Sequence, residues 1–178
     1  MHRLRGQTLG LVGYGRIARR THEMLIGFGF ARVLVHDPRA TLPAGCEHAE
    51  LDALCAEADL VSLHVPLTPQ TRRLIDARRI ALMKATAILV NTARGGLVEL
   101  DALHAALAEG RLAGAGLDVF ETEPPDPRHP IFTLDNVVVT NHIGWYSEEA
   151  MRDLQRLAAE EAVRVLRGEP PRHWLNPW

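Results

Sequence analysis

The stretch "TLGLVGYGRIARR", residues 8–20, decides the fold of this 178-residue chain. Its apolar start predicts a buried strand over residues 8–13, and residues 16–28 have the composition of a helix. Between the two, Gly13, Gly15 and Ala18 form the pattern G-x-G-x-x-A. The first glycine permits a tight turn, the second lets a ligand approach the backbone, and the small third residue lets the helix pack on the strand. Free N–H groups at the helix start favour anions, so the stretch predicts a site for the pyrophosphate of a dinucleotide.

The rest of the chain continues the alternation of strands and helices. Strands are predicted at 32–37, 59–65, 87–91, 113–120 and 137–140, and helices at 50–58, 76–83, 100–110 and 147–168. Such βαβ units build a parallel sheet covered by helices on both faces. The predicted fold class is therefore α/β, a doubly wound parallel sheet (Rossmann fold) with six or more strands.

Two boundaries follow from the same pattern. Residues 1–168 are predicted to form the dinucleotide-binding domain, and residues 169–178 a C-terminal tail. The segment 121–136 contains four prolines, which predict a loop without helix. A loop of that length in a compact domain is usually functional.

Asp37 ends the second predicted strand, 37 − 18 = 19 residues after Ala18. An acidic residue at this place binds the adenosine ribose and repels a 2′-phosphate, which favours NAD over NADP as the cofactor. Arg39 favours the opposite choice, because a nearby arginine can accommodate that phosphate. The plainer alternative is the glycine turn of any α/β protein followed by a surface aspartate.

Polar residues or glycines follow each predicted strand. Parallel strands point the same way, and ligands of open α/β sheets bind outside their carboxyl ends. We therefore expect the strand ends to line one cofactor crevice. The residues expected to bind the cofactor there are Gly13, Tyr14, Gly15, Arg16, Ile17, Asp37, Pro38, Arg39, His64, Val65, Pro66, Thr92, Ala93 and Asp118.

Three residues of this crevice have chemistry suited to hydride transfer to a carbonyl. Arg94, followed by Gly95 and Gly96, carries a permanent charge that can grip a carboxylate. His142 can exchange protons near neutral pH, and Glu123 can orient its imidazole. The alternatives are a surface arginine on a flexible loop for Arg94 and an ordinary loop histidine for His142.

Composition excludes several other classes of protein. The formal net charge is −2, which gives no sign of a nucleic-acid or membrane-surface partner. No apolar run approaches the roughly 20 residues that span a bilayer, and a signal peptide is not expected. No two of the nine histidines lie within four residues of each other, so no metal site is predicted. Cys46 and Cys55 are expected to be free thiols, which favours a cytoplasmic protein.

Four stretches resemble the nucleotide-binding domain of the D-2-hydroxyacid dehydrogenases. They are "GLVGYGRIARR", "SLHVPLTPQTRRLI", "LVNTARGGLVELDALHAALAEGRLAGAGLDVFETEPP" and "NHIGWYSEEAM". The resemblance runs from Leu4 to Pro177, and its last stretch is most similar to the branch of the C-terminal-binding proteins. It implies NAD as cofactor and a D-2-hydroxy acid or 2-keto acid as substrate.

The resemblance also implies roles for individual residues. Arg94 would bind the substrate, and Glu123 rather than Glu121 would pair with His142, the general acid in ketone reduction. Asp118 and Gly144 would hold the nicotinamide carboxamide. The remaining implied contacts are Pro66 and Thr71 near the adenosine half of the cofactor and Trp145 in the substrate pocket.

The sequence departs from the family pattern in two ways. Asn141 stands where the family has a proline before the catalytic histidine, which leaves the aim of His142 open. The chain also begins at the first strand, so the family's substrate domain is expected to be absent. We accordingly expect this chain to bind NADH, to turn over slowly or not at all, and to form a homodimer extended by the tail with Trp174 and Trp178. The alternatives are an NAD(H)-responsive interaction module of C-terminal-binding-protein type and a catalytically inactive fragment.

Overall fold

The computed structural model describes residues 3–172, which divide into two compact units. The first unit ends at His142 and contains the whole sheet. The second begins at Ile143 and contains one helix, α5 (Glu148–Leu166), which Ser147 caps by accepting a hydrogen bond from the N–H of Ala150. The predicted domain 1–168 therefore spans both units. Residues 173–178 of the predicted tail, with Trp174 and Trp178, lie outside the described residues.

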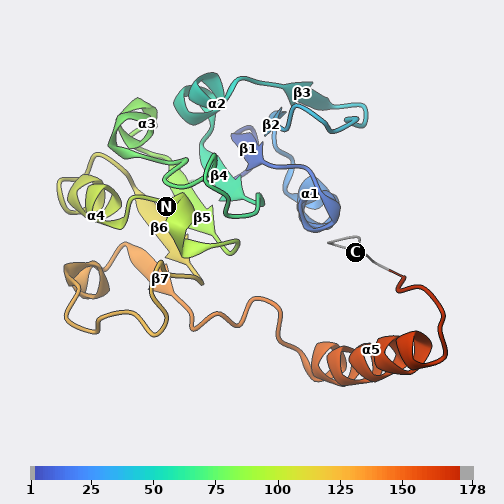
Figure 1. The fold of residues 1–178 in the computed structure, drawn as a ribbon. Coiled ribbons are helices and arrows are strands. Elements are labelled where there is room, and N and C mark those ends of the chain that lie inside the picture. Colours follow the sequence, from blue (N-terminus) through green and yellow to red (C-terminus); the bar gives the residue numbers. More distant parts are fainter. Residues whose placement is uncertain (1–2, 173–178) are drawn as a thin grey trace. The chain divides into compact units, whose positions relative to one another are not determined.

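The first unit is built on a seven-stranded sheet in which every pair of neighbouring strands is parallel (Figure 1). Its order is β3-β2-β1-β4-β5-β6-β7, so the chain builds outward from β1 in one direction and then returns to start β4 on the other side. The strands are β1 (Thr8–Val12), β2 (Arg32–His36), β3 (Cys46–His48), β4 (Leu60–Leu63), β5 (Ile88–Asn91), β6 (Gly114–Leu117) and β7 (Val137–Val139). The predicted doubly wound parallel sheet of six or more strands is confirmed.

Helices lie on both faces of this sheet (Figure 1). On one face α1 (Arg16–Leu25) covers a small core formed chiefly by β1 and β2, with Leu9, Leu11, Ala18, Val33 and Val35. On the other face three helices lie side by side over a larger core. They are α2 (Leu51–Glu57), α3 (Ala77–Leu82) and α4 (Leu100–Ala108). Strand residues alternate between the two cores, as the two-residue period of a strand requires.

The helix ends carry the expected signals. Asp76 caps α3, because its side chain accepts a hydrogen bond from the N–H of Arg79. The predicted helix 16–28 ends as an α-helix at Leu25 and continues as the 3-10 turn η1 (Ile26–Phe28). Gly29 then closes it in the left-handed conformation, with φ 71°.

Three short elements were not predicted. β3 has only three residues, none of them fully buried, so it lacks the apolar run that marks a strand. It forms because it pairs with β2 at the edge of the sheet. The 3-10 turn η2 (Gly95–Leu97) follows β5. The turn η3 (Pro130–Thr133) lies in the loop expected to lack helix, and Pro130 fits there because the first position of a helix needs no N–H donor.

Gly10 in β1 marks the tightest contact between the sheet and α2. A Cβ atom at Gly10 would lie 2.7 Å from Cδ2 of Leu54 and 2.9 Å from Cβ of Ala58. We expect Gly10→Ala to lower the free energy of unfolding by about 1–3 kcal/mol, because α2 would have to move away from β1. Urea unfolding measures this loss. Gly27→Ala is the matched control: its Cβ would meet no atom within 4 Å, and an equal loss there would contradict the packing argument.

Candidate functional site

Three hollows lie along the carboxyl-terminal edge of the sheet. The first, about 410 Å³, lies at the ends of β4 and β5 and includes Ile17, His64 and Arg94. The second, about 360 Å³, lies at the ends of β6 and β7 and includes Asp118, Glu123 and His142. The third, about 280 Å³, lies at the ends of β2 and β3 and includes Asp37 and Pro38. The strand ends therefore bring Asp37, His64, Arg94, Asp118, Glu123 and His142 to one edge of the sheet, where they line three hollows.

The glycine turn after β1 is shaped by two different constraints. Gly13 has φ 88°, and a Cβ there would lie 2.8 Å from Cγ1 of Val65 and 2.9 Å from the carbonyl oxygen of His64. This position therefore needs glycine for both its conformation and its space. A Cβ at Gly15 would meet no protein atom within 4 Å, so the space beside it is open to a ligand. Ile17 follows in the first turn of α1, where its side chain is 73% exposed.

Tyr14 lies between these glycines, but its side chain turns into the core. Its hydroxyl group hydrogen-bonds Nδ1 of His22 at 2.8 Å, and the guanidinium of Arg19 lies 5.0 Å from the ring centre. Burial and the neighbouring Cys46 raise the pKa of Tyr14 to about 12. The side chain of Tyr14 is therefore turned away from the turn, and its N–H and carbonyl groups bind Asp37 and Arg19. The neighbouring Arg16 is exposed.

Asp37 is held by the backbone around it. One carboxylate oxygen accepts the N–H of Tyr14 at 2.9 Å, and the other accepts the N–H of Arg39 at 3.0 Å. Burial alone would raise the pKa of Asp37, but hydrogen bonds from three backbone N–H groups hold it below its ordinary value. An ionised carboxylate has about four acceptor positions, so Asp37 can still accept hydrogen bonds from ribose hydroxyl groups. The side chain of Arg39 is exposed.

The segment after β4 is ordered by its own hydrogen bonds. His64 Nε2 lies 2.9 Å from the hydroxyl of Ser62, and burial lowers the pKa of His64. The hydroxyl of Thr71 donates to the carbonyl of Pro66 at 2.7 Å and accepts the N–H of Thr68 at 2.8 Å. Thr71 thus stabilises the loop next to Pro66, where the adenosine half of the cofactor was expected.

Asn91, the last residue of β5, organises the loop that carries Arg94. Its side chain is 1% exposed, accepts the N–H of Ala93 at 3.1 Å and donates to the carbonyl of Arg94 at 2.9 Å. The side chains of Thr92 and Arg94 are left exposed. Sequence reasoning missed this role of Asn91, although a buried amide at the end of an apolar strand is an unusual feature that could have identified it.

Gly95 packs the loop that carries Arg94 against the loop that follows β6. A Cβ at Gly95 would lie 1.9 Å from the carbonyl carbon of Phe120 and 2.2 Å from the backbone nitrogen of Glu121. The two backbones are therefore in direct contact, which only glycine permits. Arg94 and the proline-rich loop after β6 are held together by this contact.

Glu123 and His142 form a hydrogen-bonded pair at the ends of β6 and β7. Oε2 of Glu123 lies 2.7 Å from Nδ1 of His142, while Oε1 accepts the N–H of Phe120 at 3.0 Å. The hydrogen bond from His142 is the main cause that holds the pKa of Glu123 below its ordinary value, and the charge of Arg94 contributes in the same direction. Glu121, the other candidate for this role, forms an ion pair with Arg72 instead.

The backbone of His142 is fixed even though Asn141 precedes it. The N–H of His142 donates to the carbonyl of Asp118 at 2.8 Å, and His142 has φ 52°, which is uncommon for a residue other than glycine. In an extended segment only alternate N–H groups face the same neighbour, and here the N–H groups of Thr140 and His142 donate to Leu117 and Asp118. The hydrogen bond between His142 and Glu123 therefore forms although Asn141, and not a proline, precedes the histidine.

Gly144 and Trp145 belong to the second unit. There the ring of Trp145 packs edge-on against that of Tyr146, with ring centres 5.7 Å apart. Their expected roles at the nicotinamide and the substrate remain predictions.

No helix among residues 3–172 is long and apolar enough to cross a membrane. Within the same residues, no group of three or more His, Cys, Asp or Glu side chains is arranged to hold a metal ion.

Comparison with known proteins identifies the family. The model for the NAD-binding domain of D-isomer-specific 2-hydroxyacid dehydrogenases matches residues 1–144. Glyoxylate reductase of Thermofilum pendens is 44% identical over 178 residues, which cover 97% of this chain and 52% of that protein. The chain thus spans about half the length of this relative.

Solved structures agree with this result. A protein from Thermus thermophilus is 44% identical with a TM-score of 0.91, over 98% of this chain and 55% of that one. The NAD complex of a D-isomer-specific 2-hydroxyacid dehydrogenase from Lactobacillus delbrueckii ssp. bulgaricus is 32% identical with a TM-score of 0.85, over 93% of this chain and 55% of that one. The resemblance seen in the sequence motifs is confirmed. The chain belongs to the D-isomer-specific 2-hydroxyacid dehydrogenase family and contains its NAD-binding domain.

Proposed function

We propose that this chain supplies the NAD-binding site and the proton-transfer residues of an enzyme that interconverts 2-keto acids and D-2-hydroxy acids. The observation that carries the proposal is the pair of Glu123 and His142, 2.7 Å apart, at the same sheet edge as the glycine turn. The names of relatives such as glyoxylate reductase support a small 2-keto acid as substrate.

The structure offers a place that fits the cofactor. A pyrophosphate would fit in the open space at Gly15, next to the start of α1. The hollow of about 410 Å³ beside Arg94 has room for the groups on either side of it. Asp37 would accept hydrogen bonds from the adenosine ribose, and Asp118 from the nicotinamide carboxamide. When bound, the reduced nicotinamide supplies the hydride for the carbonyl carbon.

The chain's own residues would handle the proton and the substrate charge. Glu123 accepts a hydrogen bond from the protonated Nδ1 of His142. The other ring nitrogen, Nε2, would then exchange a proton with the substrate oxygen. In reduction His142 gives this proton to the developing alkoxide, and in oxidation it removes the proton of the hydroxyl group. Arg94 would bind the substrate carboxylate with its planar fork of donors.

The first test concerns cofactor choice. We expect the unmutated chain to bind NADH more tightly than NADPH, because the lowered pKa of Asp37 keeps a negative charge where a 2′-phosphate would lie. Asp37→Ser should reduce this difference, since the repulsion is removed and Arg39 can then approach the phosphate. Calorimetric titration with both nucleotides measures it. Equal affinities in the unmutated chain would refute the role of Asp37.

The second test concerns the proton donor. In the complete enzyme to which this chain contributes, assayed with glyoxylate and NADH, His142→Ala should lower kcat by about 10²–10⁴, the usual effect of removing a positioned acid–base group. Reduction needs the imidazolium, so it should fall as pH rises, whereas oxidation needs the neutral ring and should fall as pH decreases. Following NADH absorbance in both directions measures the two profiles.

His129→Ala is a matched control for the second test. His129 also faces a carboxylate, that of Asp101 at 3.2 Å, but lies outside the three hollows. Its loss should leave turnover nearly unchanged. If the complete enzyme binds NADH tightly yet reduces no 2-keto acid, the alternative of an NAD(H)-responsive interaction module gains support. Normal turnover by His142→Ala would rule out the proposed proton donor.

We further propose that the chain is a cytoplasmic homodimer. The free thiols of Cys46 and Cys55 support a reducing compartment. An apolar surface on α1 and η1 supports self-association, because Met24 is 61%, Ile26 66% and Phe28 50% exposed.

Light scattering tests the dimer. The unmutated chain should have twice the mass of one chain, and Met24→Asp should shift it toward the monomer because a charge would be buried at the interface. Leu82→Asp on α3, which is 39% exposed and distant in sequence, is the control and should stay dimeric. A monomeric unmutated chain would disprove the proposal.

A further inference from the structure

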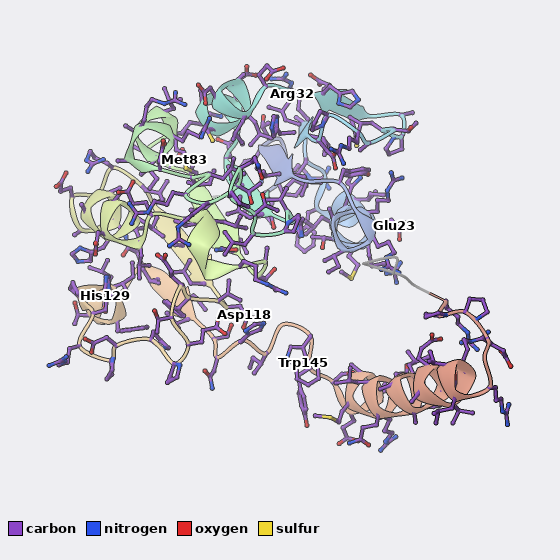
Figure 2. The ribbon with its side chains drawn as sticks, viewed as in Figure 1. Glu23, Arg32, Met83, Asp118, His129 and Trp145 are labelled. Carbon is purple, nitrogen blue, oxygen red and sulfur yellow. The ribbon has the colours of Figure 1, made fainter. Side chains whose placement is uncertain are left out.

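Asp118, labelled in Figure 2, follows β6. It lies at the centre of a small hydrogen-bond network. It is 4% exposed, its N–H donates to the carbonyl of Asn91 at 3.0 Å, and its carbonyl accepts the N–H of His142 at 2.8 Å. Its carboxylate oxygen Oδ1 accepts a hydrogen bond from the hydroxyl of Thr140 at 2.5 Å. The main chain of Asp118 is thus fixed by the neighbouring strands, and its side chain is held by Thr140.

Thr140 reaches this carboxylate because of the register between β6 and β7. Its N–H donates to the carbonyl of Leu117 at 3.0 Å, which extends the ladder one residue beyond β7. Threonine is branched at Cβ and has few side-chain rotamers, so the direction of its hydroxyl group is well defined. The hydroxyl of Thr140 is the donor of this hydrogen bond, and Oδ1 of Asp118 is the acceptor.

This hydrogen bond determines how Asp118 faces the hollow of about 360 Å³ that it shares with Glu123 and His142. A carboxyl group can turn about its last bond, and a hydrogen bond to one oxygen favours the orientations of its plane that keep this contact. The nicotinamide carboxamide has an NH₂ group that donates hydrogen bonds. The direction of the Asp118 carboxylate therefore decides how such a group, and the ring that carries it, would lie relative to His142.

We propose that Thr140 is a positioning residue that acts through Asp118 to orient the nicotinamide carboxamide. This inference rests on the proposed binding of NAD by the chain. Thr140 itself does not touch the reacting atoms.

Comparing how the chain binds two different nucleotides separates a role of Thr140 at the nicotinamide carboxamide from a general structural role. NADH carries the carboxamide, whereas ADP-ribose shares the rest of the molecule up to the second ribose. Calorimetric titration of both should show that Thr140→Val, which keeps the shape and removes the hydroxyl, weakens NADH binding about tenfold and leaves ADP-ribose binding unchanged. Thr140→Ser restores the hydroxyl and should restore most of the affinity for NADH.

Each other outcome has a distinct meaning. If Thr140→Val and a second variant, Thr140→Ala, lose both nucleotides equally or fail to fold, Thr140 has only a structural role and the inference is overturned. It is also overturned if NADH binding by Thr140→Val is unchanged. If the unmutated chain binds neither nucleotide, the proposed NAD-binding function itself fails. Binding of ADP-ribose without any gain from the nicotinamide in the unmutated chain refutes the role of Asp118 and with it that of Thr140.

Discussion

The common direction of the seven strands is the constraint on which the site depends. Each connection between consecutive strands returns the chain to the same starting edge of the sheet. All strands therefore end at the opposite edge. Residues as distant in sequence as Gly13 and His142 reach one edge for this reason. The strand order also reverses between β1 and β4, and the two loops there diverge to opposite sides. A crevice at this point is a general property of doubly wound sheets.

Backbone groups hold most of the polar side chains of the site. Asp37, Asn91 and Glu123 each bind at least one backbone N–H, so their orientation follows from the path of the chain. Each of the two carboxylates is also stabilised in its ionised form by these bonds. Polar groups fixed in this way need little reorganisation when a ligand arrives, which favours both binding and catalysis.

The sequence predicted the features that a local motif or a repeated pattern encodes and missed those that depend on single contacts. The glycine pattern at Gly13 is such a motif, the alternation of strands and helices is such a repeated pattern, and both led to the observed sheet. The strand β3 and the roles of Asn91 and Thr140 depend on partners that are distant in sequence or on the register of a ladder. The choice of Glu123 over Glu121 came from the family resemblance, and the structure explains it by the different partners of the two side chains. The positive φ of His142 leaves no trace in the sequence, because most such positions are occupied by glycine.

The contact of Gly95 with the backbone of Phe120 has a consequence for motion. Two main chains in van der Waals contact leave no flexible side chain between them that could absorb a displacement. For this reason we expect the backbone segments that carry Arg94 and Glu123 to shift together. A movement that admits a substrate would then come chiefly from elements outside these two loops.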